Sequence, residues 1–221
     1  KSGVTATINL KAGFVMAEQV LVSGIDLGWI TIVGEDAETI ITHTALTTGF
    51  NGTSYPAFGV DKGGTSPIIG QLFRFNVEKV GGNKHGLVTW GAGSSANVLA
   101  GKGFIGAGTH GIYAVTGSTI NAYNANCSNA GTHGIYAADV STINANSANC
   151  SNAGTYGICA ERGSTINAYR ARLQNQITGT VRIKVNDGSH IEATGIDTAG
   201  GTVAVFSQAV NTLTSSGIIY Q

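Results

Sequence analysis

Hydrophobic and polar residues alternate in short stretches along most of the chain. In the clearest stretches the apolar positions fall two residues apart, as at Ile112 and Ala114 and again at Ile120 and Ala122. Alternation with a period of two is typical of a β-strand that buries one face. Glycine, serine and asparagine separate the stretches, and these residues favour turns. The pattern therefore predicts many short strands joined by tight corners.

The strand pattern returns at a fixed interval between residues 108 and 175. The sequence GTHGIYA at 108–114 recurs as GTHGIYA at 131–137 and as GTYGICA at 154–160, and STINA follows each copy. This interval of 23 residues is too short for a pair of helices, and the units lack the leucines of a leucine-rich repeat. We expect an all-β, single-stranded parallel β-helix with three short strands and about 22–25 residues per coil.

Stacked coils make residues one repeat apart into vertical neighbours, at the strand spacing of about 4.8 Å. We expect Val98 to precede the second of three interior columns and Ile196 and Ile218 to continue the third, with about six coils from His85 onwards. The three columns are Ile112, Ile135 and Ile158; Ile120, Ile143 and Ile166; and Cys127, Cys150 and Leu173.

The three cysteines are predicted to be buried thiols rather than disulfide partners or metal ligands. Leu173 replaces the third member of their column, which indicates packing, and no CxxC or histidine spacing supports a metal site. We therefore predict no metal and no cofactor.

The whole chain, 1–221, is predicted to be one β-helix domain. Both prolines and many small polar residues lie in one segment, which we expect to leave the coil as a long loop. The predicted parts are opening coils at 1–45, this loop excursion at 46–70, irregular coils at 71–107, regular repeats at 108–175 and terminal coils at 176–221. Because the chain opens on Lys1, we take it as part of a longer protein.

Charge and hydropathy exclude some partners. The chain has 12 basic and 12 acidic residues and no basic run, so nucleic acid is not an expected partner. It also lacks an apolar run of the roughly 20 residues that a membrane-spanning helix requires.

Several segments resemble a known family. INLKAG at 8–13, VLV at 20–22, WITIVGED at 29–36 and TII at 39–41 resemble the opening coils of right-handed β-helices of the pectate-lyase type. The repeats resemble units of carbohydrate-active β-helix proteins, but the calcium-binding aspartate clusters of pectate lyases are missing.

Within these proteins the chain is most similar to tailspikes and tail fibres of bacterial viruses, to judge from its near-zero charge and the final segment 211–221. That resemblance implies a right-handed coil, a homotrimer in the virion tail, and recognition, often with cleavage, of a bacterial cell-surface polysaccharide. The alternatives are a secreted or cell-surface polysaccharide lyase or hydrolase, and a non-catalytic structural or adhesive stalk.

Residues between the buried positions should form outward ladders that suit a sugar chain, because amides bond hydroxyls and aromatic rings support sugar faces. Arginine forks match the carboxylate of an acidic sugar. Identical residues also stack for structural reasons alone, so this alternative stays open. The candidate glycan-binding residues are Tyr113, Tyr136, Asn144, Asn167, Tyr169, Arg162, Arg170 and Arg172.

Two sets of residues could carry catalysis. Asp139 and Glu161 could form the carboxylate pair of a glycosidase, which needs a separation of roughly 5–10 Å. His110 and His133 recur in register and could act as acid or base. Asp139 also lies under Arg162 in the repeat, so a surface ion pair is the alternative, and neither catalytic set is unique.

Overall fold

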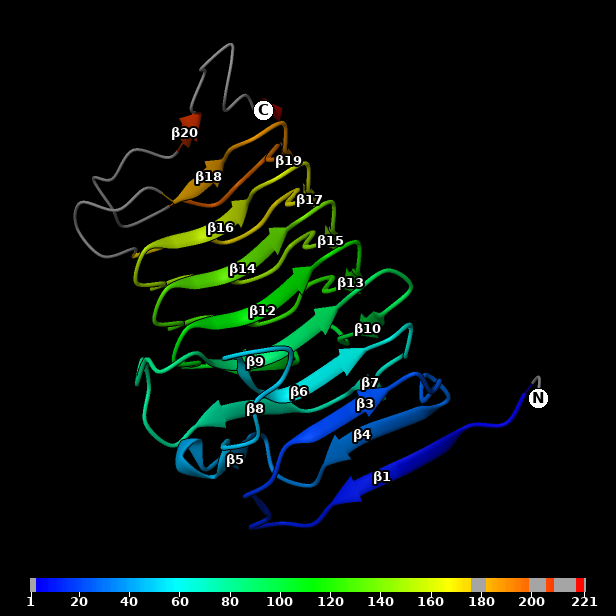
Figure 1. The fold of residues 1–221 in the computed structure, drawn as a ribbon. Coiled ribbons are helices and arrows are strands. Elements are labelled where there is room, and N and C mark those ends of the chain that lie inside the picture. The colour runs from blue at the N-terminus through cyan, green and yellow to red at the C-terminus, as the bar shows by residue number, and fades with distance from the viewer. Residues whose placement is uncertain (1–2, 176–181, 199–205, 209–217, 221) are drawn as a thin grey trace.

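The computed structural model describes residues 3–175, 182–198, 206–208 and 218–220. The chain forms a parallel β-solenoid of about seven turns, with about 25 residues per turn (Figure 1). Its strands stack into four parallel sheets. The predicted fold class is therefore confirmed. Much of the predicted terminal region 176–221 lies outside the described residues.

The longest sheet has eight strands, and each coil contributes one of them in chain order (Figure 1). The strands are β3 (Val20–Ser23), β6 (Tyr55–Asp61), β9 (Lys84–Trp90), β12 (His110–Val115), β14 (His133–Ala138), β16 (Tyr156–Ala160), β18 (Ile183–Val185) and β20 (Phe206–Gln208).

A second side of the solenoid carries two sheets. A three-stranded sheet covers the first coils and a six-stranded sheet covers the later ones. The first contains β1 (Ala6–Leu10), β4 (Ile30–Gly34) and β7 (Ile68–Ile69); the second contains β10 (Ser95–Asn97), β13 (Thr119–Asn121), β15 (Thr142–Asn144), β17 (Thr165–Asn167), β19 (His190–Glu192) and β21 (Ile218–Tyr220).

The strands on the third side of the solenoid become shorter toward the C-terminal coils. The four-stranded sheet on this side contains β2 (Val15–Met16), β5 (Thr39–Ile41), β8 (Leu72–Phe75) and β11 (Gly103–Ile105). In the regular coils it continues only as single bridges between Asn126, Asn149 and Arg172. Asn124 and Asn129 have positive φ and form corners, so only the few residues between them can be extended. The third strand of the regular coils is thus shorter than predicted.

Helix is almost absent from the described residues. The single helical turn there, η1 (His43–Ala45), is far too short to cross a membrane.

The predicted isoleucine columns are confirmed. Ile143 pairs in register with Ile120 below and Ile166 above, and all three are fully buried. Ile135 pairs in the same way with Ile112 and Ile158. Burying a side chain of this size stabilises the fold by about 1.5–3 kcal/mol, so the columns supply much of the narrow core. Cys127, Cys150 and Leu173 are also fully buried.

Three register predictions are wrong. Ala96, not Val98, lies below Ile120, because β10 meets β13 two residues earlier than a spacing of 22 implies. Ile218 pairs with His190 in the six-stranded sheet and does not continue the cysteine column. Ile196 does not continue that column either, because Arg172 pairs with Asp197, which sets Ile196 in register with Ala171 and not with Leu173. Corners of different length shift the register between coils.

The predicted loop excursion at 46–70 is also wrong. Tyr55–Asp61 forms β6, a seven-residue strand between β3 and β9, and it buries Phe58 and Val60. The longest part of this segment without a sheet strand is the stretch before β6, where an antiparallel bridge joins Phe50 and Ser54. Glycine and proline within the strand concealed it. Gly59 is needed there, because an added Cβ would lie 2.8 Å from the Leu21 side chain and 2.9 Å from the Phe50 ring.

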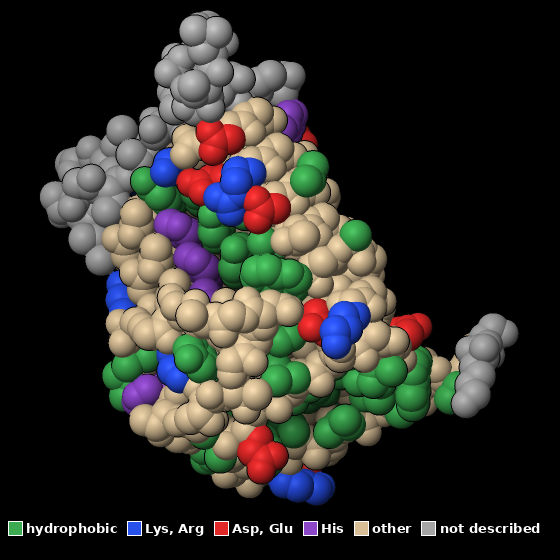
Figure 2. Space-filling model, in the orientation of Figure 1, with side chains coloured by type: hydrophobic (Ala, Val, Ile, Leu, Met, Phe, Trp, Pro, Cys, Tyr) green, Lys and Arg blue, Asp and Glu red, His purple; other side chains and the backbone are tan. Residues whose placement is uncertain are grey.

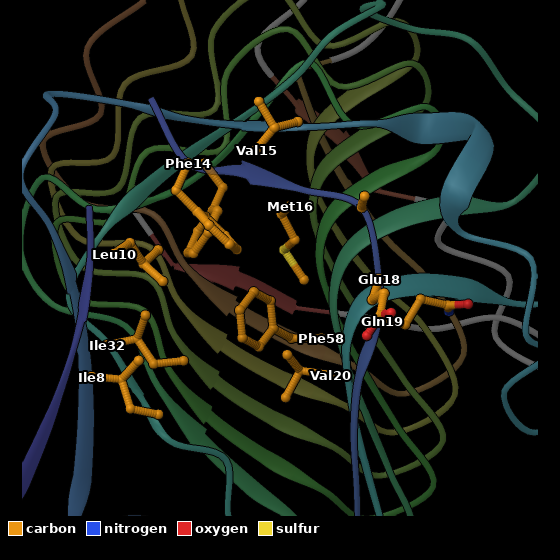
Figure 3. A pocket seen from close by; sticks show the side chains of 12 residues that line it. Ile8, Leu10, Phe14, Val15, Met16, Glu18, Gln19, Val20, Ile32 and Phe58 are labelled. Atoms are coloured by element: carbon orange, nitrogen blue, oxygen red, sulfur yellow. The ribbon is translucent and has the colours of Figure 1, made fainter. Parts of the chain in front are cut away.

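The N-terminal end of the solenoid is open. Apolar side chains from the first coils converge on a cavity of about 420 Å³ (Figure 3), among them Leu10, Phe14, Met16 and Phe58. β1 is the first strand of its sheet, and Ile8 and Phe14 remain 47% and 45% exposed. The core therefore reaches the surface at this end.

Candidate functional site

The outer face of the eight-stranded sheet carries a pair of stacked phenol rings. Tyr113 on β12 and Tyr136 on β14 pair in register, with ring centroids 4.9 Å apart and planes inclined by 10°. Both side chains are half-buried, so part of each ring meets solvent. The predicted tyrosine ladder is therefore present, and the next coil ends it with buried Cys159.

Three imidazoles stack beside the tyrosines. The ring of His110 lies 4.9 Å from that of His85 and 4.8 Å from that of His133, and we call these three residues the imidazole row. His110 and His133 meet Tyr113 and Tyr136 edge to face, at 5.2 and 5.1 Å. Figure 2 shows a line of histidine side chains beside a hydrophobic patch on this face.

A break in the strand alternation turns the histidines outward. A Cβ added to Gly111 would lie 2.8 Å from the Cβ of Cys127, so this glycine faces the core. Ile112 faces the core as well, fully buried. Two consecutive inward positions place His110 on the same side as Tyr113, which it contacts. In the next coil, a Cβ added to Gly134 would lie 2.6 Å from the Cβ of Cys150, so Gly134 faces the core in the same way.

The imidazole row is held neutral. Burial lowers the pKa of His85 to about 3, that of His133 to about 4, and that of His110 well below its usual value. The Nδ1 atom of each ring is buried and makes no hydrogen bond of normal geometry with a described residue. Rings that stay neutral so far below pH 7 are poor proton donors, so the row does not suit acid catalysis.

Glu161 anchors a polar cluster at the end of the tyrosine pair. The Tyr136 hydroxyl donates to Oε2 of Glu161 at 2.8 Å, Asn186 donates to Oε1 at 3.3 Å, and the Lys184 ammonium lies 3.3 Å from Oε1. Desolvation acts to raise the pKa of Glu161, but the hydrogen bonds from Tyr136 and Lys184 outweigh it and lower that pKa. The carboxylate is therefore ionised at neutral pH.

Asp139 and Arg162 form the ion pair that the repeat predicts. Arg162 donates through Nε to one oxygen of Asp139 and through Nη2 to the other, at 3.4 Å for the second bond. The hydrogen bond that Arg162 donates to Asp139 raises the pKa of Arg162. Nη1 of Arg162 also lies 3.5 Å from Glu161. The guanidinium is thus occupied by carboxylates of the chain itself, in a surface pair worth at most about 1 kcal/mol.

The other predicted glycan-binding residues lie on other sides. Asn144 donates to Asn121 at 3.1 Å within the six-stranded sheet, and Asn167 accepts from the backbone of Tyr169 at 3.1 Å. Arg170 lies over the Tyr169 ring at 4.9 Å, in the corner after β17. Arg172, on the third side, lies 3.9 Å from Asp197. The predicted set therefore splits over three sides.

The repeat places Tyr156 in one column with His110 and His133, but it does not reveal Lys184. Tyr156 stacks on His133 at 5.0 Å and ends the imidazole row. Lys184 pairs with Cys159 in register and lies 5.2 Å over the Tyr156 ring. The spacing of 25 residues between Cys159 and Lys184 hid the match, since the regular repeat is 23.

No metal centre is built from the residues that the structure describes, because no three His, Cys, Asp or Glu side chains there converge on one point. Cys127, Cys150 and Cys159 are buried as thiols, as predicted, and burial raises the pKa of each. Thiols held protonated in this way are weak nucleophiles.

No protein-family model, curated protein or solved structure matches the chain. The class of protein therefore follows from the fold alone: it is a parallel β-solenoid.

Proposed function

We propose that the chain is a receptor-binding module of the tailspike type that recognises a bacterial cell-surface polysaccharide. The observation that carries the proposal is the stacked pair Tyr113 and Tyr136, partly exposed on the outer face of a parallel sheet and bordered by the polar cluster around Glu161. Aromatic rings offer apolar surface to a sugar face, while charged and amide groups bond its hydroxyls.

Binding without cleavage is the form of this function that the site favours. Glu161 is ionised, which leaves it without a proton to give a glycosidic oxygen. Asp139 and Arg162 are paired with each other, and the imidazole row is neutral. A depolymerase that acts through these groups would need one of them in a different environment.

A homotrimer in a virion tail fits the exposed apolar end of the solenoid. Ile8, Phe14 and Val15 are each about half-exposed around the N-terminal cavity, and association would remove such side chains from water. The trimer and the location are part of the proposal.

A structural stalk is the second candidate, and the asparagine ladder favours it. Asn144 bonds Asn121, and Asn121 bonds Asn97, so these amides satisfy each other without a ligand. A surface whose amide groups already hydrogen-bond one another does not need a ligand to satisfy them.

A panel of immobilised capsular and O-antigen polysaccharides tests the proposal. We expect the protein to bind at least one of them and to release neither reducing ends nor unsaturated products. Binding to none would favour the stalk, and release of product would establish a hydrolase or a lyase instead.

A further inference from the structure

We infer that the imidazole row, His85, His110 and His133, is a ladder of hydrogen-bond donors that binds acceptor oxygens of an extended glycan lying along the solenoid axis. This inference rests on the proposed function and assigns a site and an orientation to it.

The spacing of the row fits a repeating ligand. Successive ring centroids are 4.9 and 4.8 Å apart, because each histidine comes from the next coil of the solenoid. Strand stacking fixes this interval at about 4.8 Å for as long as the repeat continues. An extended chain of pyranose units advances by about one coil per sugar, so its oxygens can meet successive imidazoles.

The buried environment assigns the proton to the outer nitrogen of each ring. Nδ1 of all three histidines is sealed from solvent and makes no hydrogen bond of normal geometry with a described residue, and only at His133 does a backbone group, that of Thr132, act to raise the pKa of the ring. A buried N–H without an acceptor is rarer in proteins than a buried acceptor without a donor. We therefore assign the tautomer with the proton on Nε2, which makes the outer edge of the row a line of N–H donors.

This tautomer determines what the row can recognise. The lone pair that could take a proton lies on the buried Nδ1, so the row acts as donor and not as base. It therefore selects acceptor oxygens such as those of hydroxyl, carboxylate or acetamido groups. Tyr113 and Tyr136 form the wall beside it, and the ion pair of Lys184 with Glu161 lies at the Tyr156 end.

Replacement of His110 or His133 by phenylalanine tests the role of the donors. Phenylalanine keeps the ring stack and removes the N–H, so we expect the Kd for the polysaccharide bound in the panel to rise about 2- to 10-fold per substitution. Thr142→Val on the six-stranded sheet is the matched control, because it removes an exposed donor from another face. Its Kd should stay that of the unsubstituted protein.

Fragments of the same polysaccharide test the orientation. Affinity should rise with each added sugar until the fragment spans the row, and then level off. If the histidine variants bind as well as the unsubstituted protein, the inference is overturned and the proposed function survives. If the unsubstituted protein binds no polysaccharide, both fail.

Nitrogen NMR of the imidazoles keeps the test independent of the variants' folding. We expect the Nε2–H tautomer for His110 and His133 in the unsubstituted protein at neutral pH. An Nδ1–H tautomer would remove the donor ladder and overturn the inference.

Discussion

Gly111 and Gly134 each stand between a histidine that faces outward and an isoleucine that faces the core. Their hydrogen atoms point at the Cβ atoms of Cys127 and Cys150, where a side chain has no space. The same glycine thus accommodates the cysteine column inside and directs the imidazole row outside. At this position the repeat links core packing directly to the surface chemistry.

The substitution Gly134→Ala should therefore destabilise the fold. Its Cβ would lie 2.6 Å from the Cβ of Cys150, and overpacking of this kind costs about 1–3 kcal/mol. Urea unfolding followed by circular dichroism measures the loss. Gly49→Ala is the control, since its nearest neighbour would be 3.1 Å away in an exposed turn. Equal stability of the two variants would contradict the inward orientation of Gly134.

Stability should fall in mild acid because of the imidazole row. The folded state holds the pKa of His133 at about 4 and that of His85 at about 3, below the ordinary value of 6.5. The unfolded chain therefore takes up protons first, so stability is full above pH 6.5 and is lost progressively as the pH falls toward 4.

Thermal unfolding between about pH 7.5 and 4.5 checks this dependence. Glu161 and Lys184, the charged groups nearest His133, contribute little to the slope in that range. Glu161 has a lowered pKa and titrates below it, and Lys184 has a raised pKa and titrates above it. The double variant His110→Phe and His133→Phe should flatten the pH profile. If the unsubstituted protein were equally stable at about pH 7.5 and about pH 4.5, the imidazoles would have to be hydrated in the folded state.

At the scale of the strand, the interior columns are the feature that the sequence predicts best. Ile120, Ile143 and Ile166 recur at one interval and pair in register because strands of equal length join through corners of equal length. The register fails where the corners change. Val98 lies outside the column for this reason, and β6 was mistaken for a loop because the segment has no second copy and contains both glycine and proline.

The candidate site was only partly predictable. The register alone places Tyr113 on Tyr136 and Asp139 under Arg162. It does not give the direction of the histidines, since the consecutive inward positions at Gly111 and Ile112 break the alternation on which the argument depends. Pairing across corners of unequal length, such as that of Lys184 with Glu161, also depends on geometry that no periodicity encodes.

Truncation of a central column residue should be costly. Ile143→Ala removes a fully buried side chain from a core with few alternative contacts, and we expect a loss of about 2–5 kcal/mol. Thr142→Ala, the next residue on the exposed face, should change stability by no more than about 0.5 kcal/mol. Chemical denaturation of both variants makes the comparison. A small effect at Ile143 would contradict the stacked core.

For the molecule as a whole, the proposed homotrimer is tested by the mass of the protein in solution. Sedimentation equilibrium should give a mass three times the 22.5 kDa of the chain, as the proposed homotrimer requires. Phe14→Ser, at the rim of the cavity, tests whether this end takes part, because it replaces an exposed apolar ring by a hydroxyl. A monomer at all accessible concentrations would contradict the trimer.

The most direct measurement is a crystal structure of the protein with an oligosaccharide fragment of the polysaccharide selected by the panel. We expect a glycan that lies along the axis of the solenoid, with sugar faces against Tyr113 and Tyr136 and oxygens toward His110 and His133. A glycan bound instead across the asparagine ladder of the six-stranded sheet, or in the N-terminal cavity, would contradict this expectation.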